Sequence, residues 1–149
     1  MGAIALDLGE KRVGIARTDE TGILAVPHGV YQRRSLHEDL DFLANLAREL
    51  QAEVIVVGLP LNMDGTEGSQ AQKVREFSRA LAEKSGLPVV FVDERWTTAE
   101  VERAMREAGE RPSRRKEKVD ALSAVLILQT WLETQRKGGD EGCRSSRSI

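Results

Sequence analysis

The sequence predicts an α/β domain in which a mixed five-stranded sheet carries helices on both faces. Three observations lead to this prediction. Short apolar segments separated by turn residues fill the first 31 positions. Segments with helical periodicity then alternate with two apolar runs that are short enough to be strands. The expected order is therefore β-β-β-α-β-α-β-α-α, and a strand meander that leads into β-α-β units gives a sheet with antiparallel and parallel pairs.

The first three strands are expected at residues 3–8, 12–18 and 23–31, which are rich in apolar and β-branched residues. Residues 9–11 and 19–22 separate these segments and are compatible with hairpin turns, because both contain glycine next to polar residues. Three antiparallel strands are the economical interpretation.

Helices and strands then alternate. Ser35 and Glu38 form a capping box at the start of an expected helix that ends near Gln51. A second helix follows the apolar periodicity from residue 71 and stops at Gly86, a typical left-handed C-terminal residue. Between and after these helices we expect two strands, at residues 53–58 and 89–92. The first of these is a continuous apolar run, as in a central strand that is covered on both faces.

The remaining chain is expected to hold two more helices, a charged loop and a tail. Thr97 with Glu100 is a second capping box, for a helix that ends at Gly109. We expect a charged loop over residues 110–118, followed by the most apolar helix at about 119–136. Residues 137–149 are Gly, Ser and charged residues without periodicity, so we expect one domain over 1–136 and a disordered polar tail.

Composition excludes several classes of protein. No apolar run approaches the roughly 18 residues that a membrane-spanning helix needs, and the first residues do not have the pattern of a signal peptide, so we expect a cytoplasmic protein. Cys143 is the only cysteine, which excludes an internal disulfide and a zinc cluster built on several cysteines. The net charge of −2 means that a nucleic-acid partner has to be met by a local basic patch.

Acidic residues stand where a carboxylate is awkward to bury. Asp7 ends one apolar run, Asp93 and Glu94 end another, and Asp120 opens the apolar helix near the C-terminus. Buried carboxylates without a partner are costly, so such groups usually pair, bind metal or take up a proton. Acids at two strand ends and one helix start can converge on divalent cations, which indicates metal-assisted phosphodiester chemistry.

Four ordered blocks carry a resemblance to a known family: residues 7–16 (DLGEKRVGIA), 57–65 (VGLPLNMDG), 93–98 (DERWTT) and 118–124 (KVDALSA). Together they resemble the YqgF (RuvX) family of RNase H-like nucleases, which is related to Holliday-junction resolvases. The resemblance runs from about residue 3 to residue 133. It implies an RNase H-like fold and a hydrolase that acts on phosphodiester bonds with Mg²⁺ or Mn²⁺.

The resemblance also implies a catalytic and metal-binding set of Asp7, Glu94 and Asp120. Asp93 remains the alternative to Glu94, because adjacent residues of an extended segment point in opposite directions and only one can easily face a metal. Asp93 could instead cap the next helix or pair with Arg95. The chain departs from the resolvase relatives at the end of the fourth expected strand, where they carry an acid and residues 57–60 are Val-Gly-Leu-Pro. The number of metal ions therefore stays open.

Cations near these acids are candidates for substrate contacts. Lys11 and Arg12 follow Asp7 in a turn, and Asn62 lies in the loop after a central strand. Arg95 could bind a phosphate with two hydrogen bonds or hold Asp93. A basic cluster precedes Asp120, and it is the preferred nucleic-acid contact, although solvated turns and loops explain such charges as well: Arg111, Arg114, Arg115, Lys116 and Lys118.

The function expected from the resemblance is cleavage of structured RNA, with processing of precursor 16S ribosomal RNA as the role and a monomer or weak homodimer as the state. A Holliday-junction resolvase acting on branched DNA is the alternative within nucleases, and it needs a dimer. A nucleic-acid-binding ribosome-assembly module without catalysis is another. An ATPase lobe of the actin or sugar-kinase type is a fourth, but those proteins close two such lobes around a nucleotide.

Overall fold

The computed structural model describes residues 2–93 and 121–135. Its labelled elements, in chain order, are β1 (Gly2–Leu8), β2 (Arg12–Thr18), β3 (Ala25–Gln32), α1 (Leu36–Glu49), β4 (Ala52–Leu59), α2 (Ser69–Ser85) and β5 (Val89–Asp93). Residues 121–135 form a further helical segment. The expected three strands, two helices and two intervening strands are all present up to residue 93.

The sheet has the order β3-β2-β1-β4-β5. β1 pairs with β2, and β2 with β3, in antiparallel fashion, whereas β4 runs parallel to β1 and to β5. A meander and two β-α-β crossovers thus give the mixed five-stranded sheet that the sequence predicts. The order places β1 and β4 in the centre, which explains why their sequences are apolar on both faces.

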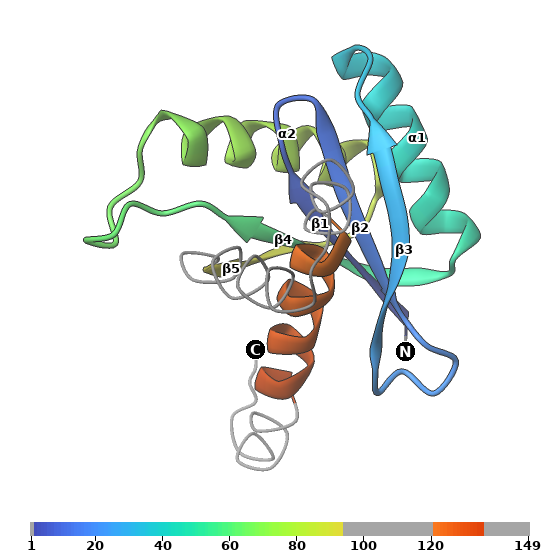
Figure 1. Cartoon of the computed structure of the whole chain (residues 1–149). Helices are drawn as coiled ribbons and strands as arrows, with labels where there is room; N and C mark the ends of the chain where they lie inside the picture. The colour runs from blue at the N-terminus through green and yellow to red at the C-terminus, as the bar shows by residue number, and fades with distance from the viewer. Residues whose placement is uncertain (1, 94–120, 136–149) are drawn as a thin grey trace, which may run out of the picture.

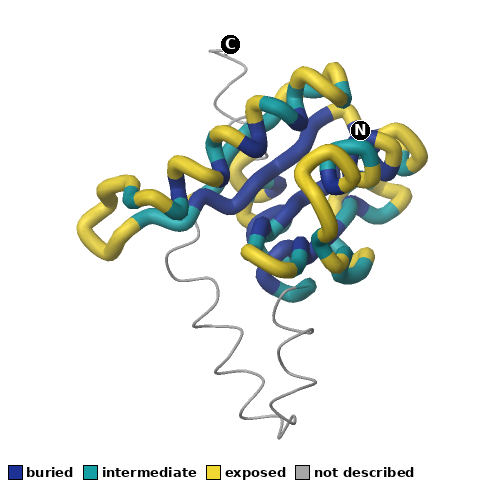
Figure 2. The backbone as a smooth tube through the Cα atoms, turned by 90° about the horizontal axis from the view of Figure 1, so that it is seen from above, coloured by how far each residue is buried: buried dark blue, intermediate teal, exposed yellow. Residues whose placement is uncertain are grey.

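Helices cover both faces of this sheet, as expected (Figure 1). On one face, Ile4 and Leu6 of β1 belong to a core cluster with residues of α1 and α2. On the other face, Ala3 and Ala5 belong to a second cluster with residues of helix 121–135. Alternation along β1 therefore separates two cores, and Figure 2 shows the strands between them as the most buried part of the chain.

The helix ends follow the local sequence signals. The Ser35 hydroxyl accepts a hydrogen bond from the backbone N–H of Glu38 at 3.2 Å and contacts the Glu38 carboxylate at 3.0 Å, which is the expected capping box. At the end of α2, Gly86 adopts a left-handed φ of 75°, and its N–H donates to the Ala82 carbonyl at 2.9 Å.

The third strand differs from the sequence expectation, because it begins at Ala25 and not at residue 23. The Asp19 carboxylate accepts hydrogen bonds from the backbone N–H groups of Ile23 and Leu24, at 3.2 and 3.3 Å. The turn therefore extends to Leu24, and both apolar side chains are exposed. An aspartate that bonds to its following backbone competes with strand pairing, which hydrophobicity alone does not reveal.

Several sequence expectations lie outside the described residues. These are the helix that ends at Gly109, the charged loop 110–118, the first residues of the last helix, and the tail 137–149. Within the described ranges, no helix combines the length and the apolar character that a membrane crossing requires.

Candidate functional site

Asp7 is the first acid of the candidate site. It lies one residue before the end of β1 and is half-buried. Because side chains alternate along a strand, Asp7 lies on the face of Ala3 and Ala5, which is the face that helix 121–135 covers. Its carboxylate is thus at the C-terminal end of a central strand, next to the second core.

Glycines stand beside Asp7 on both neighbouring strands. Asp7 pairs with Gly14 of β2, and the pairing of Leu6 with Val57 of β4 brings Gly58 to the next position. Neither glycine carries a side chain, so no Cβ crowds the carboxylate from either neighbouring strand.

The first described residues of helix 121–135 lie near the end of β1 that carries Asp7. The Gln129 side chain accepts a hydrogen bond from the backbone N–H of Ala25 at 3.2 Å, and Ala25 pairs with Thr18. Thr18 in turn accepts a hydrogen bond from Ala3, at the start of β1. The later part of the helix is therefore near the start of β1, and its first residues lie towards the end of β1 (Figure 1).

Asp120 itself lies outside the described residues, but the helix that follows it has a clear buried face. Ala124, Ile127 and Leu128 have no exposed surface and pack against the sheet. Position 120 is four residues before Ala124 and seven before Ile127, which is the spacing of one helix face. Ser123 is also wholly buried, and its hydroxyl has no hydrogen-bond partner.

The adjacent acids at the end of β5 are distinguished by the same alternation. Val89 and Phe91 pack on the α1 and α2 face, whereas Val90 and Val92 pack on the face of helix 121–135. Asp93, which pairs with Leu59 and is exposed, belongs with the first pair. Asp93 therefore lies on the opposite face from Asp7. Glu94 lies outside the described residues.

Of the three expected metal ligands, the structure thus describes only Asp7. Within residues 2–93 and 121–135, no three His, Cys, Asp or Glu side chains are grouped so that they could hold a metal ion. The metal set of Asp7, Glu94 and Asp120 stays a prediction. The observation relevant to it is that Asp7 lies on the face of the sheet covered by helix 121–135, which follows Asp120 in the chain.

A family model described as "RuvX: Holliday junction resolvase" matches residues 1–134 of the chain. The chain belongs to the RuvX family. The resemblance to YqgF (RuvX) is thereby confirmed. Two relatives support it, each named "Putative pre-16S rRNA nuclease". The protein of Syntrophomonas wolfei is 47% identical over 140 residues, which are 94% of this chain and 99% of that protein. The protein of Synechococcus sp. strain JA-2-3B'a(2-13) is 47% identical over 136 residues, or 91% and 80%.

Solved structures agree with this family on the fold. T. thermophilus RuvC in complex with a Holliday junction substrate has a TM-score of 0.60 at 18% identity, covering 92% of this chain and 96% of that one. The Fowlpox virus resolvase in complex with Holliday junction DNA has a TM-score of 0.57 at 11% identity, covering 91% and 99%. At these identities the likeness shows the fold alone, which is the expected RNase H-like fold.

In this RuvX-family chain, Lys11 and Arg12 lie at the turn that follows Asp7. Lys11 is exposed in the turn, and Arg12 is the half-buried first residue of β2. The turn is tight, because the N–H of Gly9 donates to the carbonyl of Arg12 at 2.8 Å. A Cβ added to Gly9 would lie 2.8 Å from that same oxygen. The glycine thus permits the tight turn that carries Lys11 and leads into β2 at Arg12.

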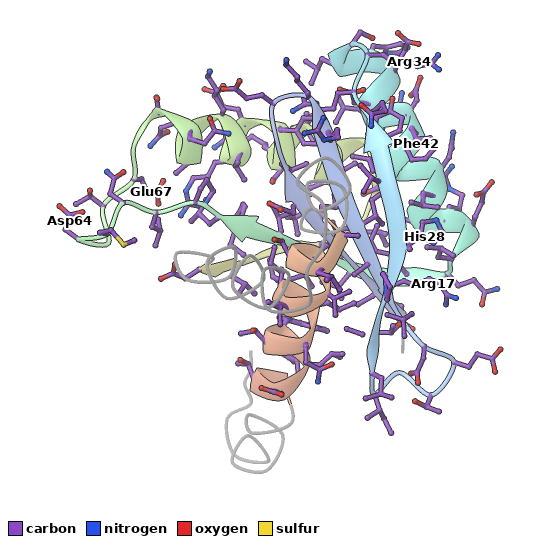
Figure 3. All side chains as sticks on the ribbon, in the orientation of Figure 1. Arg17, His28, Arg34, Phe42, Asp64 and Glu67 are labelled. Atoms are coloured by element: carbon purple, nitrogen blue, oxygen red, sulfur yellow. The ribbon has the colours of Figure 1, made fainter. Side chains whose placement is uncertain are left out.

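Asn62 has a structural role in the loop between β4 and α2. Its backbone N–H donates to the Thr66 carbonyl at 2.8 Å, and its side-chain amide donates to the Thr66 hydroxyl at 2.9 Å. The Glu67 carboxylate contacts Arg75 of α2 through two hydrogen bonds, at 2.7 and 2.6 Å. The loop, in which Figure 3 labels Asp64 and Glu67, is braced and extends away from the sheet. A substrate contact by Asn62 stays a prediction.

The expected contacts of Arg95, Arg111, Arg114, Arg115, Lys116 and Lys118 fall outside the described residues. One group that sequence reasoning missed is Asp39, which is 1% exposed in α1 and contacts Arg33 at 3.0 Å. The Arg33 guanidinium also donates to the Gly9 carbonyl at 2.9 Å. Acidic residues are common in the first turn of a helix because they interact favourably with the helix dipole. The sequence therefore does not distinguish a buried aspartate such as Asp39 from an exposed aspartate at the same position.

Proposed function

We propose that this RuvX-family chain is a nuclease that hydrolyses phosphodiester bonds in structured RNA with Mg²⁺ or Mn²⁺, in the processing of precursor 16S ribosomal RNA. One observation carries the proposal. Asp7 lies on the face that helix 121–135 covers, towards the residues of that helix that follow Asp120 in the chain. The names of the relatives support RNA as the substrate. Such a role belongs in the cytoplasm.

Asp7, Glu94 and Asp120 are the proposed metal ligands. Alternation along β5 supports Glu94 over Asp93, because Val90 and Val92 share the face of Asp7 and Asp93 does not. The buried stripe of Ala124 and Ile127 supports Asp120 by its helical spacing. Bound divalent cations would supply stabilisation of charge on the attacking and leaving oxygens of the phosphate. The chain's own carboxylates would hold and orient those ions.

The proposed substrate contacts are Lys11, Arg12, Asn62, Arg95, Arg114, Arg115, Lys116 and Lys118. Lys11 and Arg12 are supported by their place in the turn after Asp7. We further propose one catalytic domain over residues 1–136 with the tail 137–149 outside it, which the family match to residue 134 supports.

Asp7→Asn tests the proposal directly. The wild-type chain should cleave a precursor ribosomal RNA in Mg²⁺ or Mn²⁺ and lose this activity in a chelator. Asp7→Asn keeps the shape of the side chain but removes its charge, so it should fold and cleave at least a hundredfold more slowly, since a lost metal ligand removes several kcal/mol of transition-state stabilisation. Glu53→Gln, at an exposed position of β4, is the matched control and should cleave normally. A folded Asp7→Asn variant that cleaved at the wild-type rate would exclude Asp7 as a required metal ligand. A wild-type chain that bound the RNA but did not cleave it would favour a non-catalytic assembly module.

A Holliday-junction resolvase is the second candidate, because the matching family model carries that description. Two opposed strands are cut in such a junction, so the activity requires two copies of the site. A four-way DNA junction offered beside the RNA precursor, with the mass of the protein measured in solution, separates the candidates. Cleavage of RNA by a monomer supports our proposal, and symmetrical cleavage of the junction by a dimer contradicts it.

A further inference from the structure

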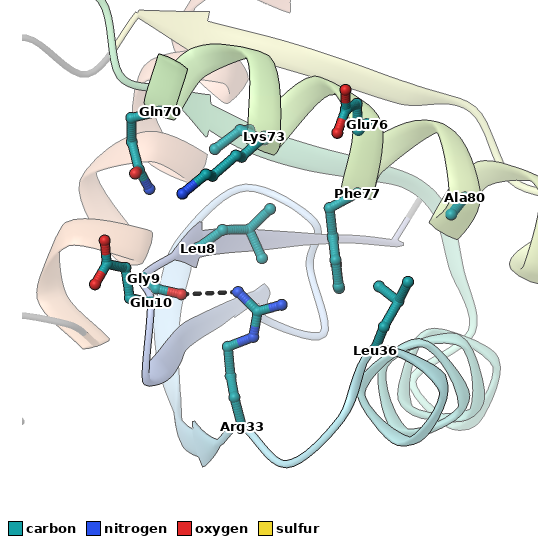
Figure 4. Close-up of a pocket in the computed structure, with 11 residues that line it drawn as sticks. Leu8, Gly9, Glu10, Arg33, Leu36, Gln70, Lys73, Glu76, Phe77 and Ala80 are labelled. Carbon is teal, nitrogen blue, oxygen red and sulfur yellow. Dashed lines mark hydrogen bonds between the residues drawn. The ribbon is translucent and has the colours of Figure 1, made fainter. Parts of the chain in front are cut away.

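A cavity of about 250 Å³ lies between α2, the start of α1 and the turn that joins β1 to β2 (Figure 4). Its floor is apolar and includes Leu8, Val74 and Phe77. A shallower hollow adjoins it on the side of Arg34, and the two share Glu10, Arg33, Leu36 and Lys73. We refer to the two together as the α2 groove.

Cationic side chains line the α2 groove. Lys11 and Lys73 are both exposed, and neither has an ion pair with another residue of the described ranges. Arg34 is exposed as well and reaches Glu38 only at 4.0 Å. In Figure 4 the amine of Lys73 points across the mouth of the cavity, between Gln70 and Glu10. The acids Glu10 and Glu76 reduce the positive potential here without pairing with either lysine.

The groove is also rigid where it meets the β1–β2 turn. Arg33 is held by the buried Asp39 carboxylate at 3.0 Å and by the Gly9 carbonyl at 2.9 Å. Its guanidinium lies 5.0 Å from the centre of the Phe77 ring. These three contacts fix the groove wall before any ligand arrives, so a ligand does not have to order it. Because Arg33 is engaged in these contacts, the cations of the groove that can contact a ligand are Lys11, Arg34 and Lys73.

From this arrangement we propose that the α2 groove binds the sugar-phosphate backbone of the RNA beside the scissile bond, with Lys73 and Lys11 contacting phosphates. The inference rests on the proposed nuclease function and names a second contact surface for its substrate. Lysine amines form charge-assisted hydrogen bonds with phosphate oxygens.

The distance along the chain supports this placement. Gly9 lines the cavity and is two residues from Asp7, so their Cα atoms are at most about 7 Å apart. Nucleic-acid strands carry one charge about every 3.4 Å along a duplex axis. Asp7 faces helix 121–135, whereas the α2 groove lies on the α1 and α2 face of the sheet. A strand whose scissile phosphate sits at Asp7 therefore passes over the end of β1 and the β1–β2 turn before its next phosphates reach the α2 groove.

The test measures binding, not cleavage. Lys73→Gln and Lys11→Gln are made singly and together in an Asp7→Asn background, and the affinity for a non-cleaved RNA precursor is measured in a chelator at several salt concentrations. Loss of one phosphate contact should lower the slope of log affinity against log salt by about 0.7 to 0.9, which corresponds to about five- to eightfold weaker binding at 0.1 M salt. The double variant should lose about twice that slope.

Arg79→Gln is the matched control. Arg79 is an exposed cation of the same helix, lies outside the groove lining, and loses the same charge on substitution. It should leave affinity and slope near those of the parent. If Lys73→Gln behaves like Arg79→Gln in both quantities, the inference is wrong. An intact RNA affinity together with loss of binding to an acidic peptide would mean that the groove takes a protein partner, which also overturns it.

Failure of the inference can be told from failure of the proposed function. Full cleavage by Asp7→Asn removes Asp7 as a required metal ligand, and the comparison of RNA affinities in a chelator, which withholds the metal, is unaffected. If the lysine variants bind RNA normally, the α2 groove is not an RNA contact, and the proposal that the wild-type chain cleaves RNA still stands.

Discussion

The buried carboxylate of Asp39 and the guanidinium of Arg33 form a 3.0 Å ion pair that joins α1 to the turn behind Asp7. The carboxylate is 2% exposed, and it also accepts hydrogen bonds from the Tyr31 hydroxyl at 2.9 Å and from the backbone N–H of Arg34 at 3.0 Å. Through Arg33 this acid acts on the carbonyl of Gly9. A residue far from Asp7 in sequence thus positions the turn that carries Lys11.

Asp39→Asn should lower the free energy of unfolding by about 2 kcal/mol, because a buried charge pair loses one partner while the partial exposure of Arg33 limits the penalty. Urea unfolding at pH 7 measures this. Asp41→Asn is the matched control, two positions further along the same helix. Asp41 is half-exposed and pairs with Lys84 at the surface, so its loss should change stability little. Equal effects of the two substitutions would contradict a special role for Asp39.

The Asp39 contribution should vanish in acid. Burial raises the pKa of Asp39, but hydrogen bonds from the Arg34 N–H, from Arg33 and from Tyr31 more than offset this, so the pKa lies below its usual value. A lowered pKa in the folded state gives stability that is fully present above the unfolded value of about 3.9 and is lost as the pH falls through the folded value. The difference in stability between wild type and Asp39→Asn should therefore be constant from pH 7 to 5 and shrink below pH 4. If the difference in unfolding free energy between the two proteins grew as the pH fell, the pKa of Asp39 would be raised in the folded state and not lowered.

Gly9→Ala should destabilise the protein by about 2 kcal/mol and weaken RNA binding, because its Cβ would meet the backbone oxygen of Arg12 at 2.8 Å. The turn has to shift, and Lys11 moves with it. Gly86→Ala provides the comparison. No atom lies within 4 Å of an added Cβ there, so only the left-handed φ of 75° opposes alanine, at about 1 kcal/mol. Thermal unfolding and RNA affinity should separate the two, since Gly86→Ala should leave binding unchanged.

Most of the fold could be predicted because local signals and global packing agree in it. The Ser35 and Glu38 capping box, the left-handed Gly86 and the uninterrupted apolar run of β4 each give one interpretation. The start of β3 could not be predicted, because the Asp19 side chain takes up backbone N–H groups that hydrophobicity would assign to a strand.

The candidate site could be predicted only in part. Asp7 was identifiable because a carboxylate at the end of an apolar strand is unusual. The glycines beside it, Gly14 and Gly58, become meaningful only once the strand register is known. Lys73 could not be found from the sequence, since exposed lysines on a helix are common and only the fold brings this one to the turn after β1. Contacts between residues distant in sequence carry no local pattern.

Mn²⁺ should stabilise the wild-type chain and not Asp7→Asn. A metal that binds only the folded state adds about 2.7 kcal/mol when it is present at a hundred times its dissociation constant. The melting temperature should rise with Mn²⁺ for wild type and for the Glu53→Gln control, and stay flat for Asp7→Asn. An equal rise in all three proteins would place the metal away from Asp7.

Two buried serines offer a last comparison. Ser78 in α2 and Ser123 in helix 121–135 are 2% and 0% exposed, and the hydroxyl of each has no hydrogen-bond partner. An unsatisfied buried hydroxyl is costly, and alanine is the better helix former, so each Ser→Ala change should raise the free energy of unfolding by about 1 kcal/mol without metal.

Mn²⁺ should then separate the two serine variants. Ser123 is three positions after Asp120, on the helix face that packs on the sheet of Asp7, where its hydroxyl can bond to a water of the bound ion. Ser78 lies in α2, whose buried residues pack on the other face. Ser123→Ala should therefore weaken the Mn²⁺-dependent rise in melting temperature, and Ser78→Ala should keep it in full. If both variants keep the whole rise, Ser123 is only a packing residue and the ion is held without its hydroxyl.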